Sequence, residues 1–308
     1  MIEKEASGDK NSLRLIRFTN SFRDGLQQVL QRSGRHSRIL VPAYVGLSLV
    51  EGSGVLDPIK NSKANFSFYE VDKYLDPVIS SLKREIQVFQ PSHVLVINYF
   101  GFLISNREEV FELLRLHGVV TIEDFAHLLA PLRNRRQVKN LADIEIYSLH
   151  KTIGSNFGGG AVCTNFSSQQ NIRETISTAD CVAYAHADLD YIAKKRIRNY
   201  NWLNKRFHSI NQTKCRFFFD DGRKPILPLN YPVRLISSAS RHSLYTQLRT
   251  GNVFPTALYH RLVPDIKFSD FPVSAEVSGT ILNLPVHQDV ELHQLKALMQ
   301  IVEKFSNE

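Results

Sequence analysis

Short runs of apolar residues recur along the first half of the chain, at 38–41, 94–97, 119–122 and 144–147. Each run has the length of a buried strand, and Pro42 ends the first of them. Runs that are apolar at nearly every position are typical of parallel strands, because such strands are buried on both faces of the sheet. These four segments are therefore predicted to form the core of one mostly parallel sheet.

Segments with helical periodicity lie between these runs. Helices are expected from about 20 to 34, from 76 to 86 and from 106 to 118. The first begins at Asn20 and Ser21, which are favoured N-cap residues, and the second opens on an Asp-Pro pair. Repeated alternation of strand and helix predicts an α/β fold with three layers, in which helices cover both faces of the sheet.

Beyond about residue 180 this rhythm changes. The remaining elements are expected in the order of a long polar helix at 186–208, strands at 216–219 and 226–235, a helix at 238–250 and an amphipathic helix through 292–301. This pattern is typical of a smaller α+β domain. We therefore expect a large α/β domain in residues 1–185, with the connecting helix and a small C-terminal α+β domain in residues 186–308.

The length of the chain agrees with this organisation, and its net charge limits the classes of ligand that it is expected to bind. The chain has 308 residues, of which 43% are hydrophobic, and its 38 basic and 30 acidic residues give a net charge of +8. Such a surplus attracts polyanions and phosphorylated small molecules. The basic cluster at 133–139 either serves such a ligand or is, as is more usual, a solvated loop. No nucleic-acid-binding signature accompanies it, which argues against nucleic acid as a partner.

The sequence also argues against a membrane, secretion and a cysteine-built metal site. No run of eighteen apolar residues occurs, and the first twelve residues lack the apolar centre of a secretory signal. The cysteines Cys163, Cys181 and Cys215 lie far apart and form no C-x-x-C pair. We therefore expect a cytoplasmic protein without a metal site.

Candidate catalytic residues follow two successive predicted strands. Asp124 comes just after one strand, whereas Ser148 and Lys151 follow the next, ahead of a glycine-rich stretch at 154–160. In an open parallel sheet, ligands bind beyond the carboxyl ends of the strands, so these residues are expected to lie together. The helix that starts at Asn20 offers free N–H groups and a positive dipole end, which suit a phosphate.

Each of these residues is ordinary alone, but together they fit Schiff-base chemistry. A lysine amine condenses with the aldehyde of pyridoxal 5'-phosphate, whose ring then serves as an electron sink. A carboxylate beside the ring nitrogen keeps that nitrogen protonated. A serine hydroxyl and helix N–H groups are suitable donors to the phosphate, and glycines let the backbone pass close to the cofactor.

Six segments carry a family resemblance. They are I-E-D-F-A-H at 122–127, S-L-H-K at 148–151, G-G-G-A-V at 158–162, V-P-A-Y at 41–44, N-Y-F-G at 98–101 and L-P-V-H at 284–287. Together they resemble the DegT/DnrJ/StrS family of sugar aminotransferases, which belong to fold type I of the pyridoxal-phosphate enzymes. The resemblance covers the chain from about residue 18 to its end.

The resemblance implies roles for individual residues. Lys151 would bind the cofactor as a Schiff base, and Asp124 would pair with the ring nitrogen. His127 would lie against the ring near Asp124, Ser148 would contact the phosphate, and Tyr44 would stack on the ring. The helix start that holds the phosphate in the family is matched here by Asn20, Ser21, Phe22 and Arg23. The family also implies a homodimer with its sites at the subunit interface.

The implied function is an aminotransferase that moves an amino group from a donor such as glutamate to a keto-sugar nucleotide or a related keto substrate. Two alternatives stay open. The order His150-Lys151 is similar to that of pyridoxal-phosphate decarboxylases, which leaves a decarboxylase or lyase. A non-catalytic binding or partner subunit is the other alternative, although the presence of both Lys151 and Asp124 favours an enzyme. The L-P-V-H segment and the small size of the chain favour the aminotransferase.

Overall fold

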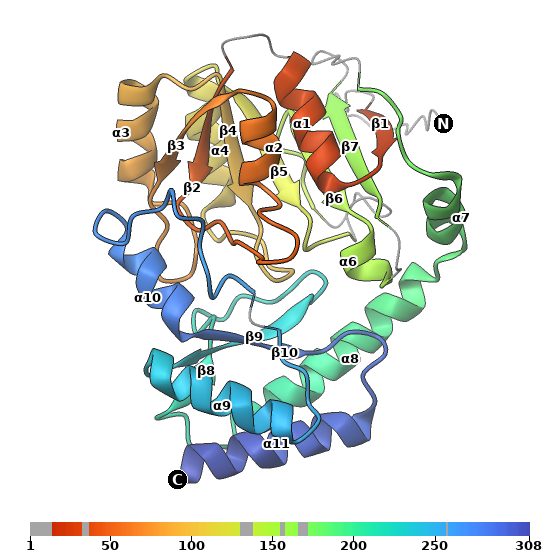
Figure 1. The fold of residues 1–308 in the computed structure, drawn as a ribbon, viewed down its shortest axis with the longest axis vertical. Helices are drawn as coiled ribbons and strands as arrows, with labels where there is room; N and C mark the ends of the chain where they lie inside the picture. Colours follow the sequence, from red (N-terminus) through yellow and green to blue (C-terminus); the bar gives the residue numbers. More distant parts are fainter. Residues whose placement is uncertain (1–13, 33–36, 130–137, 155–157, 166–171, 257) are drawn as a thin grey trace.

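Two β-sheets joined by a long helix make up the molecule (Figure 1). The computed structural model describes residues 14–32, 37–129, 138–154, 158–165, 172–256 and 258–308. The part up to residue 186 is called the large-sheet region below, and residues 189–308 are called the small-sheet region. None of the helices in the described part of the chain combines the length and hydropathy that a membrane span needs.

The large sheet has seven strands in the order β1-β7-β6-β5-β4-β2-β3. Its strands are β1 (Arg14–Thr19), β2 (Arg38–Pro42), β3 (Asn65–Tyr69), β4 (His93–Ile97), β5 (Val120–Phe125), β6 (Ile144–Ser148) and β7 (Gly160–Asn165). The five strands from β2 to β6 are mutually parallel, whereas β7 is antiparallel to both β6 and β1. The prediction of a mostly parallel α/β sheet is confirmed.

Helices cover both faces of this sheet. The helices of this region are α1 (Phe22–Arg32), α2 (Leu56–Asn61), α3 (Ile79–Phe89), α4 (Arg107–Leu116), α6 (His150–Ile153) and α7 (Thr178–His186), of which α6 and α7 lie outside the two layers. In Figure 1, α1 passes in front of β6 and β7 while α4 lies behind the sheet. Leu26, Val29 and Leu30 of α1 are fully buried, as their helical spacing predicts.

The structure departs from the sequence expectation at several places, of which those near the candidate site matter most. The helix expected from Asp76 begins only at Ile79, because the Asp76 carboxylate pairs with Arg223 at 2.6 Å instead of serving as a cap. Strand β5 runs on to Phe125, so Asp124 lies within the strand and not after it. The edge strands β1 and β3 were not expected. The side chains of β3 are mostly only partly buried, so this strand lacks the continuous apolar run of the central strands.

The small-sheet region is built on an antiparallel sheet in the order β10-β9-β8. Its elements are α8 (Leu189–Phe207), β8 (Cys215–Phe217), β9 (Asn230–Leu235), α9 (Ser238–Thr250), α10 (Pro272–Thr280), β10 (Ile281–Pro285) and α11 (Leu292–Asn307). The long polar helix expected at 186–208 is α8, which runs beneath the large sheet and leads into this region (Figure 1). The domain boundary at residue 185 stays a prediction.

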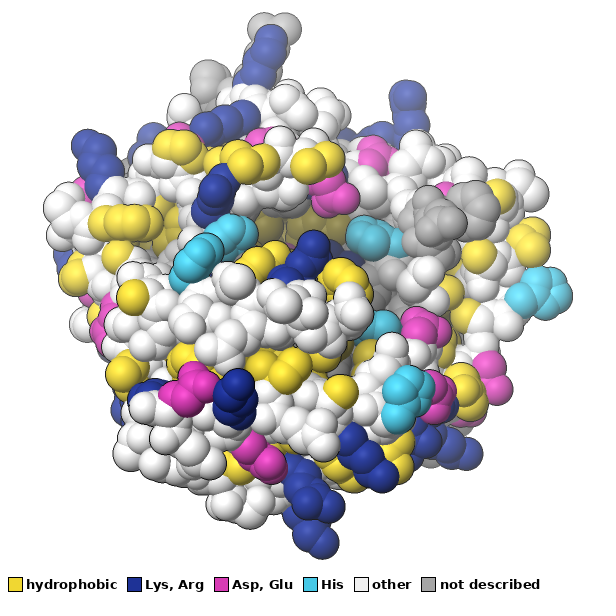
Figure 2. All heavy atoms as spheres, turned by 60° about the horizontal axis from the view of Figure 1, so that its bottom comes forward, with side chains coloured by type: hydrophobic (Ala, Val, Ile, Leu, Met, Phe, Trp, Pro, Cys, Tyr) yellow, Lys and Arg dark blue, Asp and Glu magenta, His cyan; other side chains and the backbone are white. Residues whose placement is uncertain are grey.

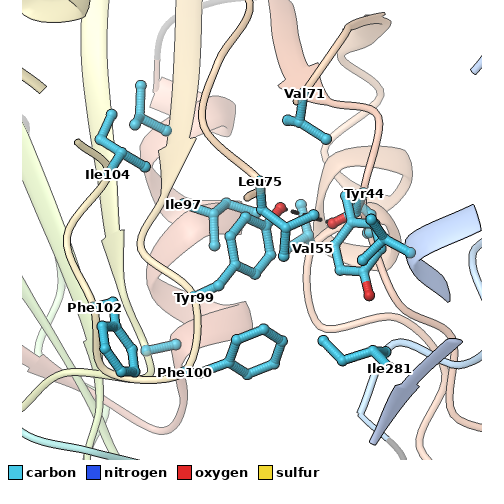
Figure 3. Close-up of a cluster of buried hydrophobic side chains, with 14 of the residues drawn as sticks. Tyr44, Val55, Val71, Leu75, Ile97, Tyr99, Phe100, Phe102, Ile104 and Ile281 are labelled. Carbon is cyan, nitrogen blue, oxygen red and sulfur yellow. Dashed lines mark hydrogen bonds between the residues drawn. The ribbon is translucent and has the colours of Figure 1, made fainter. Parts of the chain in front are cut away.

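The two regions share one hydrophobic core. A single cluster of buried side chains extends from Leu26 in α1 to Val302 in α11. Figure 3 shows part of it, where Ile281 of β10 approaches Tyr44 and Phe100 of the large-sheet region. The carboxyl ends of the parallel strands therefore face the small-sheet region across packed side chains.

Candidate active site

Lys151 lies in α6, a single helical turn that directly follows β6. Burial lowers the pKa of its amine. The carboxylates of Asp124 and Glu51 oppose this shift, whereas the Arg23 guanidinium adds to it. A lysine with a lowered pKa has a larger unprotonated fraction near neutral pH, which is the form that acts as a nucleophile or a base.

Asp124 lies one strand away, near the carboxyl end of β5. Its side chain is 4% exposed, and Oδ1 accepts a hydrogen bond from the Ala126 N–H at 2.6 Å. Burial raises the pKa of this carboxyl group to about 7, with a further contribution from Glu123, while the Ala126 N–H and the Lys151 amine act in the opposite direction. A cation placed beside such a carboxyl group would stabilise its ionised form.

Glu123, the preceding residue, is buried but fully matched. Its carboxylate receives Arg107 Nε at 2.7 Å and Arg107 Nη2 at 2.6 Å, together with Asn98 Nδ2 at 2.9 Å. The Asn98 amide oxygen also accepts the Ile104 N–H at 3.2 Å. This network fixes the ends of β4 and β5, and so it fixes the backbone from which Asp124 projects.

His127 is buried close to Lys151 and Asp124. Its Nδ1 accepts the Phe100 N–H at 3.0 Å, which leaves the proton of the neutral ring on Nε2. Burial lowers the pKa of His127, and the charge of Lys151 lowers it further. Phe100 has a φ of 59°, in the left-handed region, and this conformation directs its N–H at the histidine. The site therefore holds a neutral imidazole with one donor nitrogen.

The start of α1 lies against the glycines of β7. Asn20 O accepts the Gly159 N–H at 2.6 Å. A Cβ atom added at Gly160 would lie 2.5 Å from the Ser21 carbonyl carbon, so this close approach requires glycine. Ser21 Oγ accepts the Asp24 N–H at 3.1 Å and caps the helix.

This helix start retains hydrogen-bonding capacity for an anion. Among the described residues, the N–H groups of Phe22 and Arg23 donate to no acceptor, and the Arg23 guanidinium forms no ion pair. Arg23 is nevertheless close enough to lower the pKa values of both His150 and Lys151. Ser148 is buried at the end of β6, where its hydroxyl meets His150 Nδ1 at 3.1 Å. These donors suit an anionic group such as a phosphate.

Aromatic rings close the other side of the site. Tyr44 is fully buried, its ring centroid lies 5.3 Å from that of Tyr259, and its hydroxyl has no hydrogen-bond partner in the described structure. In Figure 3 this hydroxyl points toward Ile281. Tyr259 comes from the small-sheet region, and its ring lies 5.8 Å from that of His127.

Tyr259 occupies the space that the missing side chain of Gly46 leaves open. A Cβ atom at Gly46 would lie 2.6 Å from Tyr259 Cδ1. Tyr259 has a φ of 61°, an unusual backbone conformation for an aromatic residue, and strain of this kind often marks functional sites. No local sequence pattern identifies Tyr259, because its contacts form only when the two regions of the chain pack together.

The other charged residues that the structure describes are mostly paired or scattered. Residues 133–137 of the predicted basic cluster lie outside the described residues, and Lys139 pairs with Glu108 at 3.2 Å. Figure 2 shows lysine and arginine side chains scattered over the small-sheet side of the molecule, with a hollow bordered by basic and histidine side chains. Within the described residues, no three His, Cys, Asp or Glu side chains are grouped to hold a metal ion.

Neither protein-family models nor curated proteins match the chain, but solved structures do. The aminotransferase TlmJ from Streptoalloteichus hindustanus is 18% identical, with a TM-score of 0.76 over 94% of this chain and 85% of that one. A DegT DnrJ EryC1 StrS aminotransferase from Brucella abortus is 16% identical, with a TM-score of 0.73 over 95% and 86%. DesI, solved in the presence of its TDP-sugar product, is 14% identical, with a TM-score of 0.76 over 95% and 81%.

The chain therefore has the fold of these aminotransferases along almost its whole length, as the sequence resemblance predicted. At such low identity the likeness concerns the fold alone.

Proposed function

We propose that this protein is a pyridoxal 5'-phosphate-dependent aminotransferase in which Lys151 carries the cofactor and Asp124 faces its ring nitrogen. One observation carries the proposal: Asp124 is buried near the end of β5, the partly buried Lys151 follows the adjacent parallel strand β6, and each charged group shifts the pKa of the other. A buried carboxylate with a pKa near 7 fits a cationic ring nitrogen, whose charge would favour the ionised form. A structural neighbour, NtdA from Bacillus subtilis, was solved with bound cofactor PMP.

The phosphate would lie at the start of α1. The N–H groups of Phe22 and Arg23, the Arg23 guanidinium and the Ser148 hydroxyl supply donors and positive charge there. Asn20 and Ser21 contribute the backbone turn and the cap that hold this helix start in place. These are the roles that the family resemblance implies for these residues, and they stay predictions.

The faces of the cofactor ring would be held by His127 on one side and by aromatic side chains on the other. His127 presents a neutral donor nitrogen, because its Nδ1 is occupied by the Phe100 N–H. The stacking role predicted for Tyr44 stays a prediction. The Tyr259 ring contacts those of both Tyr44 and His127, with centroid distances of 5.3 Å and 5.8 Å, so it belongs to the aromatic wall beside His127.

When bound, the cofactor supplies an electron sink for the bond to the substrate's α-carbon. The chain supplies the rest. Lys151, whose pKa burial lowers, is suited to accept and return a proton as general base and acid. The buried Asp124 and the neutral His127 hold the ring in orientation, and the packing between the two sheets limits the access of water.

The proposed amino donor is glutamate and the proposed acceptor is a phosphorylated keto-sugar, such as a sugar nucleotide. The net charge of +8 supports an anionic substrate, and DesI was solved with a TDP-sugar product. We further propose that the protein works in the cytoplasm as a homodimer, with a cofactor-binding domain in residues 1–185 and a smaller domain in residues 186–308.

Absorbance spectroscopy tests this proposal. Purified full-length protein mixed with pyridoxal 5'-phosphate should acquire the visible band of a lysine-bound cofactor, and Lys151→Ala should lack it. Glutamate should bleach the band, and a keto-sugar nucleotide should restore it. A protein without the band would refute the cofactor assignment. Carbon dioxide release without amino transfer would instead favour a decarboxylase.

A second variant tests the role of Asp124. Asp124→Asn should keep the visible band yet lower kcat by roughly a hundredfold or more, because the ring nitrogen loses its counter-charge. An unchanged kcat would rule out the role given to this carboxylate.

A further inference from the structure

The helix that carries Lys151 cannot hold its position alone. α6 is one turn long and closes with a hydrogen bond of 2.9 Å from the Gly154 N–H to His150 O. So short a helix is unstable by itself. The carbonyl groups of its last residues, Lys151, Thr152 and Ile153, have no acceptor role inside the helix and need outside donors.

Arg196 supplies most of these donors from the small-sheet region. Its side chain projects from the first half of α8 and is 2% exposed. Nη2 donates to Lys151 O at 3.1 Å and to Thr152 O at 2.9 Å, while Nε donates to Gln288 Oε1 at 2.9 Å. The guanidinium therefore binds the backbone carbonyl group of Lys151 directly.

Gln288 completes the contact. Its Nε2 reaches Ile153 O at 3.5 Å, so three successive carbonyls of α6 receive side-chain donors. The loop that carries Gln288 is in turn tied to α8 by Asn199, one turn after Arg196. The Asn199 amide donates to the carbonyl oxygens of Val286 at 3.4 Å, His287 at 3.1 Å and Val290 at 3.0 Å.

The burial of the Arg196 guanidinium at this position is energetically unfavourable. Its hydrogen bonds within the described residues all go to uncharged oxygens, and burial lowers its pKa to about 10, with Asp289 opposing that shift. Burying a charge without a carboxylate partner is unfavourable. The cluster of carbonyl groups at the end of α6 is what offsets this cost, because carbonyl oxygens at a helix end attract a cation.

The same guanidinium also reaches the opposite side of the site. Its Nη1 donates to Pro228 O at 3.4 Å. The Leu229 N–H, next in the chain, donates to Phe100 O at 2.9 Å, and the Phe100 N–H is the group that binds His127. Arg196 thus connects the backbone of Lys151 with the turn that orients the histidine.

We propose that Arg196 is a positioning residue for Lys151: through the carbonyl groups of α6 it sets where the lysine amine stands relative to Asp124. The proposal rests on the proposed function for its catalytic meaning, but the contact with α6 does not depend on any bound group. It makes the reactivity of Lys151 a property of both regions of the chain.

Three variants test this role in the full-length protein. Arg196→Met removes every donor, Arg196→Lys keeps the charge with fewer donors, and Gln288→Met removes only the outer contact. Lys205→Met, an exposed change further along α8, is the matched control. Urea unfolding reports stability, and absorbance titration reports the dissociation constant of pyridoxal 5'-phosphate and the pH midpoint of its visible band. Reductive methylation followed by mass spectrometry reports the reactivity of Lys151 without cofactor.

Arg196→Met should raise the dissociation constant roughly 10-fold, which corresponds to the loss of about one hydrogen bond to a charged group. It should also move the pH midpoint of the band and change the methylation rate of Lys151 but not of Lys205. Arg196→Lys should restore part of each loss, and Lys205→Met should behave as the wild type. If Arg196→Met fails to fold, Arg196→Lys and Gln288→Met carry the same comparison in milder form.

A lower unfolding midpoint with unchanged cofactor affinity, pH midpoint and Lys151 methylation would overturn the proposal, since it would make Arg196 a purely structural residue. A wild-type protein that forms no visible band would refute the proposed function instead. In that case the methylation rate of Lys151 in the variants still decides whether Arg196 positions the lysine.

Discussion

Glu123 and Asp124 are neighbours on one strand, both are buried carboxylates, and their surroundings differ completely. Successive residues of a strand point to opposite faces of its sheet. On one face Glu123 is matched by two nitrogen atoms of Arg107 and by the Asn98 amide. On the other face, Asp124 receives one backbone N–H and lies close to Lys151, whose amine it does not reach by a hydrogen bond.

Of these two neighbouring residues, Glu123 contributes to stability, whereas Asp124 belongs to the candidate site. The Glu123 face resembles an ordinary buried ion pair, which is complete without any ligand. Burial raises the pKa of both carboxyl groups, but Glu123 has Arg107 and Asn98 as partners. The Asp124 face also holds a lysine with a lowered pKa and a tyrosine hydroxyl without a partner among the described residues. Polar groups left unmatched in a protein interior are costly, so a cluster of them indicates a place where a ligand supplies the missing partners.

Removing the cation that pairs with Glu123 should have the largest effect on stability. Arg107→Met leaves a buried carboxylate without its cation, and we expect the free energy of unfolding to fall by about 3–5 kcal/mol in urea denaturation. The double variant Arg107→Met/Glu123→Leu should recover most of this loss. Lys139→Met, which breaks an exposed pair with Glu108, should cost at most about 0.5 kcal/mol. A loss below about 1 kcal/mol for Arg107→Met would contradict the assignment.

The protonation of Asp124 should make the free energy of unfolding depend on pH. In the cofactor-free protein the pKa of Asp124 is raised from its ordinary value of 3.8 to about 7, so the folded state holds this proton more tightly than the unfolded state. The stabilising contribution is therefore complete below about pH 4 and is lost as the pH rises to about 7. Relative to Asp124→Asn, the wild type should lose on the order of 2–4 kcal/mol of unfolding free energy across this range. Parallel curves for the two proteins would disprove the raised pKa.

Tyr259 distinguishes the two faces further, because this residue of the small-sheet region packs its ring on the Asp124 side. Tyr259→Ala should weaken pyridoxal 5'-phosphate binding about tenfold, since a ring-to-ring contact of this kind contributes about 1 kcal/mol or more. Gly46→Val should weaken it similarly from the other direction, because its side chain would displace the Tyr259 ring. Both are measured by absorbance titration. Tyr259→Phe keeps the ring and serves as the control that should bind nearly normally.

The smallest effect is expected at Tyr44. Because its hydroxyl is buried without a partner, Tyr44→Phe should leave the unfolding free energy unchanged or raise it by up to about 1 kcal/mol. Thermal unfolding at fixed pH measures this difference. A clear loss of stability would show that the hydroxyl takes part in a hydrogen bond and that this side of the site is better matched than described.

The sequence predicts the parts of this site that depend on local chain geometry. Asp124 and Lys151 follow from two apolar strands, because parallel strands bring their carboxyl ends to one edge of the sheet. The capped start of α1 at Ser21 follows in the same way. The central strands were found because burial on both faces leaves a continuous apolar signal.

Contacts between distant segments were beyond prediction. Asp76 looked like a helix cap, but Arg223 takes its carboxylate from far along the chain. Arg196 falls within the long polar helix that the sequence predicts, and only its contact with α6 shows that it is buried. In each case the same residue type suits both a surface and an interior role, and the tertiary partner decides between them.

The pairing of β1 with β7 sets an order of assembly. Thr19 lies opposite Gly160, and among the described strands β1 pairs with β7 alone. During synthesis the segment before α1 therefore waits for about 140 further residues, or roughly 10–30 s at usual translation rates. The end of the site that offers donors to an anion forms only when β7 arrives.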